Sequence, residues 1–427
     1  MATPSSALAQ FGGTPVRSAP WPKWPVADSH CQRNLLNVLH SELWAISGCS
    51  QKQDLFEKQF GSDFADFCGM RYGVPCANGT AALTIAMEAL GIGPGDQVIV
   101  PGVTWVACPS SVYQLGAVPV LVDIDDKTLC LDLMKVEEAI NSKTKAIMAV
   151  HLYCSFVDLK KLKKLSKKTG VPVIEDCSQA HGAKWGKQRI GSFGEISTFS
   201  LQQSKLLTCG EGGVCLTNNR ELYYRMQEFR ADGRRYGGTV KPWNDYQIKN
   251  SGLESGRNLC MSEFHAAIAC AALPRLDQQN QWRRDRAHHL ETMLQEVDGV
   301  EMVDCPEDVS ERTFYRLCFR INRTTFQDAS VAAISEAMSH ELKLLVDRID
   351  PPLNQHPLYD PRKSPRLKSN KERQQRYNPQ LFTLPASEKA YDNCITMPHQ
   401  MLLGDERDMQ EIVMAFRKIQ AEIGQHL

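Results

Sequence analysis

The segment Ser197–Gly213, STFSLQQSKLLTCGEGG, is the part of the chain from which fold and chemistry are best inferred. A β-rich apolar run ends at Ser200, a single lysine follows at Lys205, and a glycine-rich turn closes the segment. A lysine in a loop is usually a solvated charge, and its amine attacks an aldehyde only where the surroundings keep it neutral. Lys205 is therefore a candidate for covalent chemistry, provided that the rest of the chain supplies a matching site.

The overall composition is that of an ordinary globular protein. Of 427 residues, 42% are hydrophobic and 23% are charged, and this length favours two domains. Lys+Arg and Asp+Glu both number 49, and this zero net charge argues against nucleic acid or an anionic membrane as the main partner. The apolar runs are strand-sized and the N-terminus resembles no signal peptide, so neither a membrane span nor secretion is expected.

The 15 cysteines are scattered and form no C-x-x-C pair. Several of them, such as Cys215 and Cys270, lie inside apolar runs. This pattern predicts no metal site and no disulfide framework. It predicts reduced cysteines that pack in the core, as expected of a cytoplasmic protein.

β-rich runs and helix-like segments alternate along the first half of the chain. The β-rich runs are Gln97–Val100, Val118–Asp123, Ala146–Leu152, Val171–Glu175, Ile196–Leu201 and Gly213–Thr217. The helix-like segments are Ala81–Leu90, Val106–Leu115, Leu133–Ile140 and Leu159–Thr169. The alternation predicts an α/β fold with a mostly parallel sheet covered on both faces. Such sheets bind ligands at the carboxyl ends of their strands, so the loops just after these runs are where a site is expected.

The first 45 residues are rich in proline and tryptophan, as in PWPKWP. The prolines prevent a regular helix, so residues 1–45 are predicted to form an extended arm. This arm would lie over the body of the molecule or over a partner subunit, with Trp21 and Trp24 as its anchors.

Residues 46–280 are expected to form a large domain and residues 281–427 a smaller C-terminal α/β domain. The boundary lies near a polar helix pattern at about Arg275–Val297. The small domain contains a basic loop, Asp360–Gln380, which could be a nucleic-acid patch. At zero overall charge, a solvated or substrate-facing surface is the better interpretation.

Two features before the lysine suggest an anion site and a flat ring. Asn78-Gly79-Thr80 stands at the start of a predicted helix, where free N–H groups and the helix dipole attract anions. Trp105 follows a predicted strand and could lie on a heteroaromatic ring. Each has an ordinary alternative, a plain helix cap and a core tryptophan, respectively.

Two further features complete the set. The run VIEDCSQ ends in acids, and Asp176 at the end of a buried strand needs a partner such as a protonated pyridine nitrogen. Gln179 could donate to a phenolic oxygen, and Ser200 could bind a phosphate. With Lys205 as the Schiff-base lysine, these parts together describe a site for pyridoxal phosphate, whose protonated ring acts as an electron sink.

The sequence resembles the DegT/DnrJ/EryC1/StrS family of pyridoxal-phosphate-dependent sugar aminotransferases, which have fold type I. The matching stretches are NGTAAL, VIVPGVTWVA, VPVLVDID, VHLY, VIEDCSQAHGA, GSFGEISTFSLQQSKLLTCGEGGV and NLCMSEFHAA. Within the family, GGTPVRSAPWPKWP and QQSK are similar to the cyclitol branch. That branch transfers an amino group from L-glutamine to scyllo-inosose or 2-deoxy-scyllo-inosose in the biosynthesis of aminocyclitol antibiotics.

The resemblance implies a role for each candidate residue. Lys205 would form the Schiff base and move the proton, and Asp176 would pair with the pyridine nitrogen. Gln179 would contact the phenolic oxygen, and Trp105 would stack on the ring. The phosphate would be held by Gly79, Thr80 and Ser200, and by Asn258 from the neighbouring subunit of a homodimer.

Two positions depart from the family pattern. Cys260 stands where most members have arginine, which leaves open what binds the carboxylate of the amino donor. Cys154 replaces the usual glycine after the tyrosine of VHLY.

Three alternatives remain at this stage. An aminohydroxybenzoate synthase has a similar lysine segment, and a nucleotide-sugar aminotransferase could use the loop Asp360–Gln380 to hold a diphosphate. A regulatory role is disfavoured because Lys205, Asp176 and Ser200 are all retained. Among residues that could contact the acceptor, Tyr315, His356 and Tyr359 are candidates.

Overall fold

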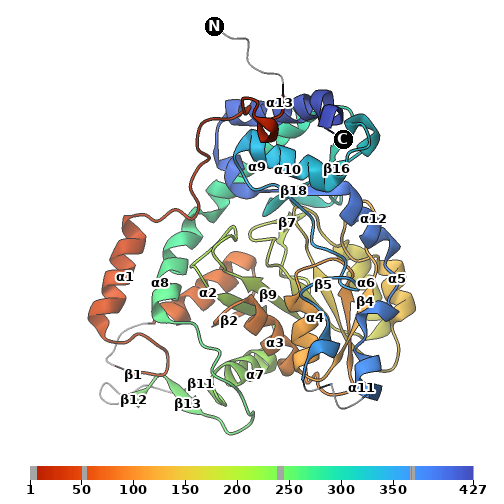
Figure 1. The fold of residues 1–427 in the computed structure, drawn as a ribbon. Coiled ribbons are helices and arrows are strands. Elements are labelled where there is room, and N and C mark those ends of the chain that lie inside the picture. Colours follow the sequence, from red (N-terminus) through yellow and green to blue (C-terminus); the bar gives the residue numbers. More distant parts are fainter. Residues whose placement is uncertain (1–6, 51–54, 238–244, 366, 368–370, 427) are drawn as a thin grey trace.

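The computed structural model describes residues 7–50, 55–237, 245–365, 367 and 371–426. Its main sheet has seven strands in the order β2-β10-β9-β6-β5-β3-β4 (Figure 1). These are β2 Tyr72–Cys76, β3 Gln97–Pro101, β4 Val118–Val122, β5 Thr144–Val150, β6 Val173–Asp176, β9 Ile196–Ser200 and β10 Gly213–Thr217. Strand β10 runs antiparallel to both of its neighbours, β2 and β9, and the other neighbouring pairs in this sheet are parallel. The predicted α/β fold with a mostly parallel sheet is confirmed.

Helices pack around this sheet. They are α2 Phe56–Cys68, α3 Gly79–Ala89, α4 Ala107–Gln114, α5 Leu133–Ala139, α6 Leu159–Thr169, α7 Arg220–Arg230 and α8 Glu263–Ala272. Of these, α3, α4, α5 and α6 lie where the sequence predicts helices. In α6, LKKLKKLSKKT, the leucines at helical spacing are buried while the lysines face solvent. Asp158 caps its first turn and Gly170, at φ 72°, ends it.

The sequence pattern did not predict strand β2. Gly73 and Pro75 both disfavour a strand, and proline is tolerated because β2 is at the sheet edge. A Cβ on Gly73 would lie 2.1 Å from the carbonyl oxygen of Gly61, so glycine is needed where α2 packs closely on this strand.

The C-terminal part contains an antiparallel four-stranded sheet in the order β14-β16-β18-β17. Its strands are β14 Val300–Met302, β16 Arg316–Ile321, β17 Asp347–Arg348 and β18 Cys394–Pro398. Helices α9 Leu276–Leu294, α10 Val331–Leu342 and α13 Glu406–Glu422 lie around it (Figure 1). The smaller elements include α11 Lys371–Arg376, α12 Pro385–Asn393, β1 Cys49–Ser50, β7 Lys184–Trp185, β8 Gln188–Arg189, β11 Arg234–Tyr236, β12 Asp245–Tyr246, β13 Ile248–Asn250 and β15 Val309–Glu311.

The N-terminal arm is extended only in its first part. Residues 29–41 form helix α1, Ser29–Ser41, because the prolines end at Pro25 and Asp28 caps the helix with a bond from the N–H of Cys31. Both tryptophans bind other parts of their own chain. The indole N–H of Trp21 donates to the carbonyl of Leu342 at 2.8 Å, and that of Trp24 to the carbonyl of Lys205 at 3.1 Å.

The cysteines whose side chains the structure describes are free thiols, and most of them are buried. They therefore serve as packing residues, as the sequence predicts. Within that part, no helix has the length and apolar character needed to cross a membrane.

Candidate active site

A cavity of about 1210 Å³ lies between the carboxyl ends of the parallel strands and the antiparallel sheet. Seven of the predicted site residues line it: Gly79, Thr80, Trp105, Asp176, Gln179, Ser200 and Lys205. They come from four separate stretches of sequence. Asn258 does not line the cavity of its own chain. It is exposed, and its side-chain oxygen accepts from the N–H of Cys260 at 3.4 Å.

The residues predicted to bind an anion, Gly79, Thr80 and Ser200 (here the anion cradle), lie close to the start of α3. The Asn78 side chain caps the helix by accepting from the N–H of Ala81 at 2.8 Å. A Cβ on Gly79 would lie 2.6 Å from Cβ of Ser200, and one on Gly213 would lie 2.4 Å from the carbonyl oxygen of Asn78. The glycines therefore allow the start of α3 to pack directly against the strands, which brings Ser200 close to the helix N-terminus, where anions are attracted.

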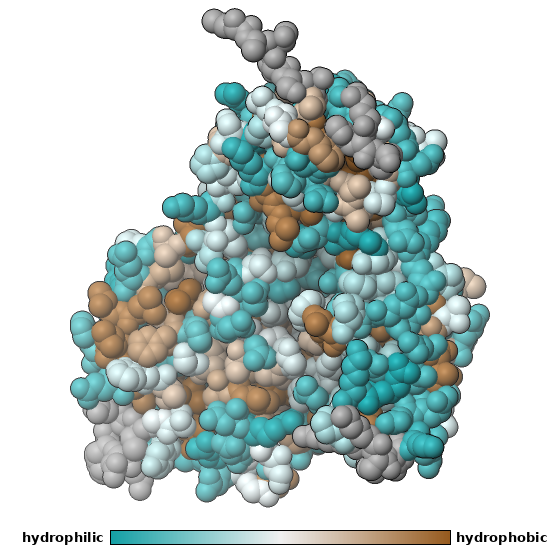
Figure 2. Space-filling view, viewed as in Figure 1, coloured by the Kyte–Doolittle hydropathy of each residue, from teal (hydrophilic) through white to brown (hydrophobic). Residues whose placement is uncertain are grey.

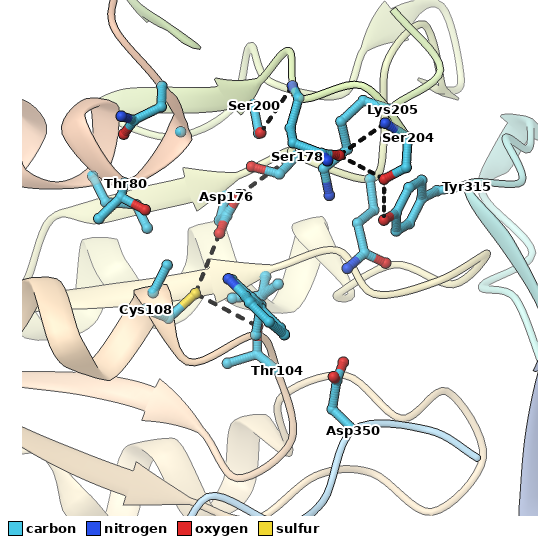
Figure 3. Close-up of a pocket in the computed structure, with 18 of the residues that line it drawn as sticks. Thr80, Thr104, Cys108, Asp176, Ser178, Ser200, Ser204, Lys205, Tyr315 and Asp350 are labelled. Atoms are coloured by element: carbon cyan, nitrogen blue, oxygen red, sulfur yellow. Dashed lines mark hydrogen bonds between the residues drawn. The ribbon is translucent and has the colours of Figure 1, made fainter. Parts of the chain in front are cut away.

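Asp176, at the end of β6, is held by two donors. Its Oδ1 accepts from the N–H of Ser178 at 3.0 Å, and its Oδ2 accepts from the thiol of Cys108 at 3.3 Å (Figure 3). Burial, followed by the nearby Asp176 charge, raises the pKa of the Cys108 thiol well above its ordinary value, so Cys108 stays a donor. Because a thiol is a weak donor, the carboxylate keeps capacity for a stronger partner in the cavity.

Gln179 is buried, and its amide orientation is set by the backbone. Its Oε1 accepts from the N–H of Tyr153 at 2.5 Å. The NH₂ group is thus the end of Gln179 that remains to donate a hydrogen bond, as a contact to a phenolic oxygen requires.

Lys205 lies beside an aromatic ring. Its Nζ is 4.0 Å from the centre of the Tyr315 ring, and the Tyr315 hydroxyl is 2.9 Å from that of Ser204 (Figure 3). The backbone N–H of Lys205 donates to the carbonyl of Gln202 at 2.8 Å. These contacts hold the lysine in a tight turn against the small antiparallel sheet.

Two buried histidines support this turn from outside the cavity. Nε2 of His181 donates to the carbonyl of Ser200 at 2.9 Å, and Nε2 of His399 donates to the carbonyl of Ser204 at 3.1 Å. Burial, with a smaller contribution from the Lys205 charge, lowers the pKa of His181 to about 3. Both histidines are therefore neutral near pH 7, since burial also lowers the pKa of His399 well below its ordinary value.

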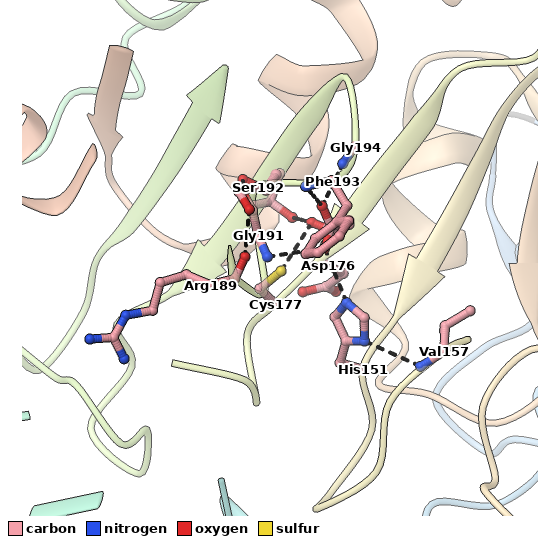
Figure 4. A network of polar contacts seen from close by, with 12 residues as sticks. His151, Val157, Asp176, Cys177, Arg189, Gly191, Ser192, Phe193 and Gly194 are labelled. Atoms are coloured by element: carbon pink, nitrogen blue, oxygen red, sulfur yellow. Dashed lines mark hydrogen bonds and ion pairs between the residues drawn. The ribbon is translucent and has the colours of Figure 1, made fainter. Parts of the chain in front are cut away.

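A second polar network lies behind Asp176. The buried carboxylate of Glu175 accepts from the N–H groups of Gly191, Phe193 and Gly194 at 3.0, 2.7 and 2.5 Å, and lies 3.3 Å from Nε2 of His151. Figure 4 shows this arrangement around the loop that precedes β9. Burial alone would raise the pKa of Glu175, but the bond and charge of His151 and the backbone donors lower it below its ordinary value.

His151, Glu175 and Cys177 also have the side-chain atoms of a possible metal site, all within 4.8 Å of one another. The Glu175 oxygens, however, are already occupied by backbone donors. Burial raises the pKa of the Cys177 thiol well above its ordinary value, which keeps it protonated, whereas a metal-bound cysteine is a thiolate. The cluster is best explained as a support that fixes strand β6.

The structure accounts for the two departures from the family pattern. The residue with positive φ, 58°, is Tyr153 rather than Cys154, so no glycine is required at position 154. Cys154 is buried, and its carbonyl accepts from Nε of Arg312 at 2.6 Å. Cys260 packs against the small cluster of Leu43, Ile46, Leu55, Ala231 and Ile248 and does not line the cavity.

Among the acceptor candidates, only Tyr315 lines the cavity, while His356 and Tyr359 are buried elsewhere. Within the described part of the loop Asp360–Gln380, no residue lines the cavity either, and Arg362 pairs with Asp360 at 2.8 Å. Its residues 366 and 368–370 lie outside the described part of the chain.

The lining residues that sequence reasoning missed include Tyr153, Asp350 and Arg316. Asp350 and Arg316 belong to the C-terminal part of the chain, and the sequence pattern did not show which residues of that part face the cavity.

Fold and cavity together define an α/β enzyme with a lysine, an acid and an anion cradle at the ends of its strands. The family model of the DegT/DnrJ/EryC1/StrS aminotransferase family matches residues 27–417. The chain therefore belongs to this family and is an aminotransferase, as its resemblance implied.

Two relatives of known name align with this chain over almost its whole length. L-glutamine:2-deoxy-scyllo-inosose aminotransferase of Streptomyces kanamyceticus is 42% identical, covering 97% of both chains. L-glutamine:scyllo-inosose aminotransferase of Streptomyces griseus is 39% identical, also covering 97% of both. Among solved structures, 3-amino-5-hydroxybenzoic acid synthase superposes with a TM-score of 0.77 at 28% identity, covering 96% of this chain and 100% of that one.

Proposed function

We propose that the cavity holds pyridoxal 5′-phosphate. The observation that carries this proposal is the convergence of Lys205, Asp176, Gln179 and the anion cradle in one cavity. A phosphate fits the start of α3 because the missing Cβ of Gly79 lets Ser200 lie close to the helix N-terminus. A protonated ring nitrogen fits Asp176, which has only a weak donor and a backbone donor. When bound, this cofactor supplies an electron-withdrawing ring that stabilises negative charge at the carbon bearing the amine.

The protein's own residues then have defined tasks. Lys205 would hold the cofactor through its ε-amine and would act as the base that removes the proton from the donor Cα. The Asp176 carboxylate keeps the ring nitrogen protonated, and Gln179 donates to the phenolic oxygen. Trp105, which is 53% exposed and lines the cavity, would cover the ring face.

The amino donor is proposed to be L-glutamine and the acceptor a cyclitol ketone such as scyllo-inosose or its 2-deoxy form, in aminocyclitol antibiotic biosynthesis. The names and the 39–42% identity of the relatives support this choice. For the donor carboxylate we propose Arg316, next to Tyr315. Arg316 lines the cavity, and its nearest acid, Asp347, is 3.6 Å away.

The active unit is proposed to be a homodimer in which Asn258 reaches the phosphate of the neighbouring subunit. Two observations support this: Asn258 is exposed and outside its own cavity, and apolar side chains gather on the surface over α1 (Figure 2). Leu36, Leu39 and Trp44 in this region are each about half exposed. Such a patch is typical of an interface.

A panel of ketones tests the proposed function. Protein reconstituted with pyridoxal phosphate and L-glutamine is offered scyllo-inosose, 2-deoxy-scyllo-inosose, an aminoshikimate and a nucleotide-linked keto sugar, and amine product is measured by mass spectrometry. We expect amination of one or both inososes. Aromatisation of the aminoshikimate, or amination of the nucleotide sugar alone, would contradict the assignment and favour the corresponding alternative.

A further inference from the structure

The wall of the cavity opposite Lys205 carries an acid that the reaction chemistry above does not use. Asp350 lies in the loop after β17 and lines the cavity. In Figure 3 it lies across the cavity from Lys205 and Tyr315, with its carboxylate directed into the space between them.

Asp350 is held in place by Tyr153. The Tyr153 hydroxyl donates to Oδ2 of Asp350 at 3.1 Å and accepts from the N–H of Asp350 at 2.8 Å. Burial, followed by the charge of Asp350, raises the pKa of Tyr153 well above its ordinary value, so the phenol remains a donor. Oδ1 of Asp350 accepts no hydrogen bond from any residue that the structure describes.

Tyr153 connects this acid to the cofactor side of the cavity. Its backbone N–H orients Gln179 at 2.5 Å, while its hydroxyl orients Asp350. The positive φ of 58° is unusual for a bulky residue, and such conformations persist where surrounding contacts enforce them. Next to Asp350, the carbonyl of Gly102 accepts from the N–H of Leu353 at 2.8 Å, which ties the loop to the end of β3.

We propose that Asp350, positioned by Tyr153, determines specificity for a polyhydroxylated ring by accepting hydrogen bonds from adjacent ring hydroxyls. This inference rests on the proposed function and names the group that would recognise its acceptor. An ionised carboxylate is an acceptor only, and two neighbouring hydroxyls can donate to its oxygens. An anionic diphosphate or a donor carboxylate would be repelled at the same position, which separates this subsite from Arg316.

The first test is a binding measurement that involves no chemistry. The affinity of reconstituted protein for scyllo-inositol, a ring of hydroxyls without a ketone, is measured by calorimetry. Asp350→Asn should weaken binding on the order of 10- to 100-fold, because a charged acceptor is lost. Tyr153→Phe, which keeps the ring and the backbone N–H to Gln179, should weaken it less. Asp308→Asn, at an exposed ion pair with Lys160, serves as the control and should leave the affinity unchanged.

The second test separates the two half-reactions. Single-turnover rates are measured for L-glutamine with protein that holds pyridoxal phosphate, and for the ring ketone with protein that holds pyridoxamine phosphate, which supplies the amino group. Asp350→Asn should raise the KM of the ketone half-reaction on the order of 10- to 100-fold and change the glutamine half-reaction far less. The double variant Tyr153→Phe/Asp350→Asn should have the same KM in the ketone half-reaction as Asp350→Asn, since Tyr153 acts through Asp350.

The outcomes distinguish the two proposals. If the unaltered protein aminates no ring ketone, the proposed function fails and this assignment fails with it. If it aminates an inosose and Asp350→Asn binds scyllo-inositol and uses the ketone equally well, only the role of Asp350 is overturned. Equal losses in both half-reactions would also overturn it, because they indicate a general structural role.

Discussion

Asp176 illustrates how a single side chain is prepared for a cationic partner. A carboxylate at the end of a buried strand is costly without compensation, and here the compensation is one backbone N–H and one thiol. The Glu175 network directly before it in the sequence keeps the strand end in place. Asp176 thus lines the cavity without a cationic protein partner in these hydrogen bonds, so its charge is left for a cation bound in the cavity.

Replacing this charge gives the first prediction. Asp176→Asn keeps the shape but cannot hold the ring nitrogen of the cofactor protonated. If the pKa of the ring nitrogen falls by about two units, the protonated form of the ring loses about 2.7 kcal/mol of stabilisation. The glutamine half-reaction should therefore slow about 100-fold. Stopped-flow absorbance measures this rate. A variant within threefold of the unaltered protein would contradict the role of Asp176.

At the scale of elements, the Lys205 turn depends on segments distant in sequence. The buried His181 contributes a pH dependence of stability, because its pKa is about 3 in the folded protein and near 6.5 when unfolded. Between these values the unfolded chain binds the extra proton. The contribution of His181 to the free energy of unfolding is therefore fully present above pH 6.5 and is lost as the pH falls toward 3.

His181→Gln should remove this contribution while keeping an N–H for the carbonyl of Ser200. The difference in stability between unaltered and variant protein should change by up to about 1.4 kcal/mol per pH unit below pH 6.5. Urea unfolding at several pH values measures it. His40→Gln, at an exposed position in α1, is the control, and identical pH profiles for His181→Gln and the unaltered protein would refute the prediction.

The N-terminal arm supports the same turn through Trp24. Trp24→Phe keeps an aromatic ring but loses the bond to the carbonyl of Lys205, so stability should fall by about 1 kcal/mol. The urea midpoint reports this change. Trp282→Phe, at a tryptophan of α9 that is 52% exposed, should have little effect. Equal midpoints for the two variants would indicate that the arm does not hold the turn.

For the whole molecule, the proposed shared active site predicts complementation between subunits. Lys205→Ala and Asn258→Ala homodimers should each be strongly impaired. After the subunits are mixed and exchanged, heterodimers contain one intact site, so about one quarter of all sites should recover activity. No recovery, with exchange verified by mass spectrometry, would argue against a site built from two subunits.

The sequence predicted the large sheet well, because its strands and helices have clear periodicity and the site residues follow strand ends. It did not predict β2, whose Gly73 and Pro75 resemble a turn, nor α1, whose Asp28 cap follows a proline-rich stretch. Tyr153 and Asp350 could not be paired from sequence, because they are 197 residues apart and meet only through the packing of the C-terminal part. Asn258 remains a prediction that a single chain cannot test.

The most direct test of the central claim is the absorbance of the bound cofactor through both half-reactions. Purified protein reconstituted with pyridoxal phosphate should be yellow, should bleach with L-glutamine, and should regain its colour with scyllo-inosose or its 2-deoxy form. Lys205→Ala should lose the lysine-dependent absorbance and all turnover. Normal transamination by Lys205→Ala, or unaltered protein that neither bleaches nor recovers, would contradict the account.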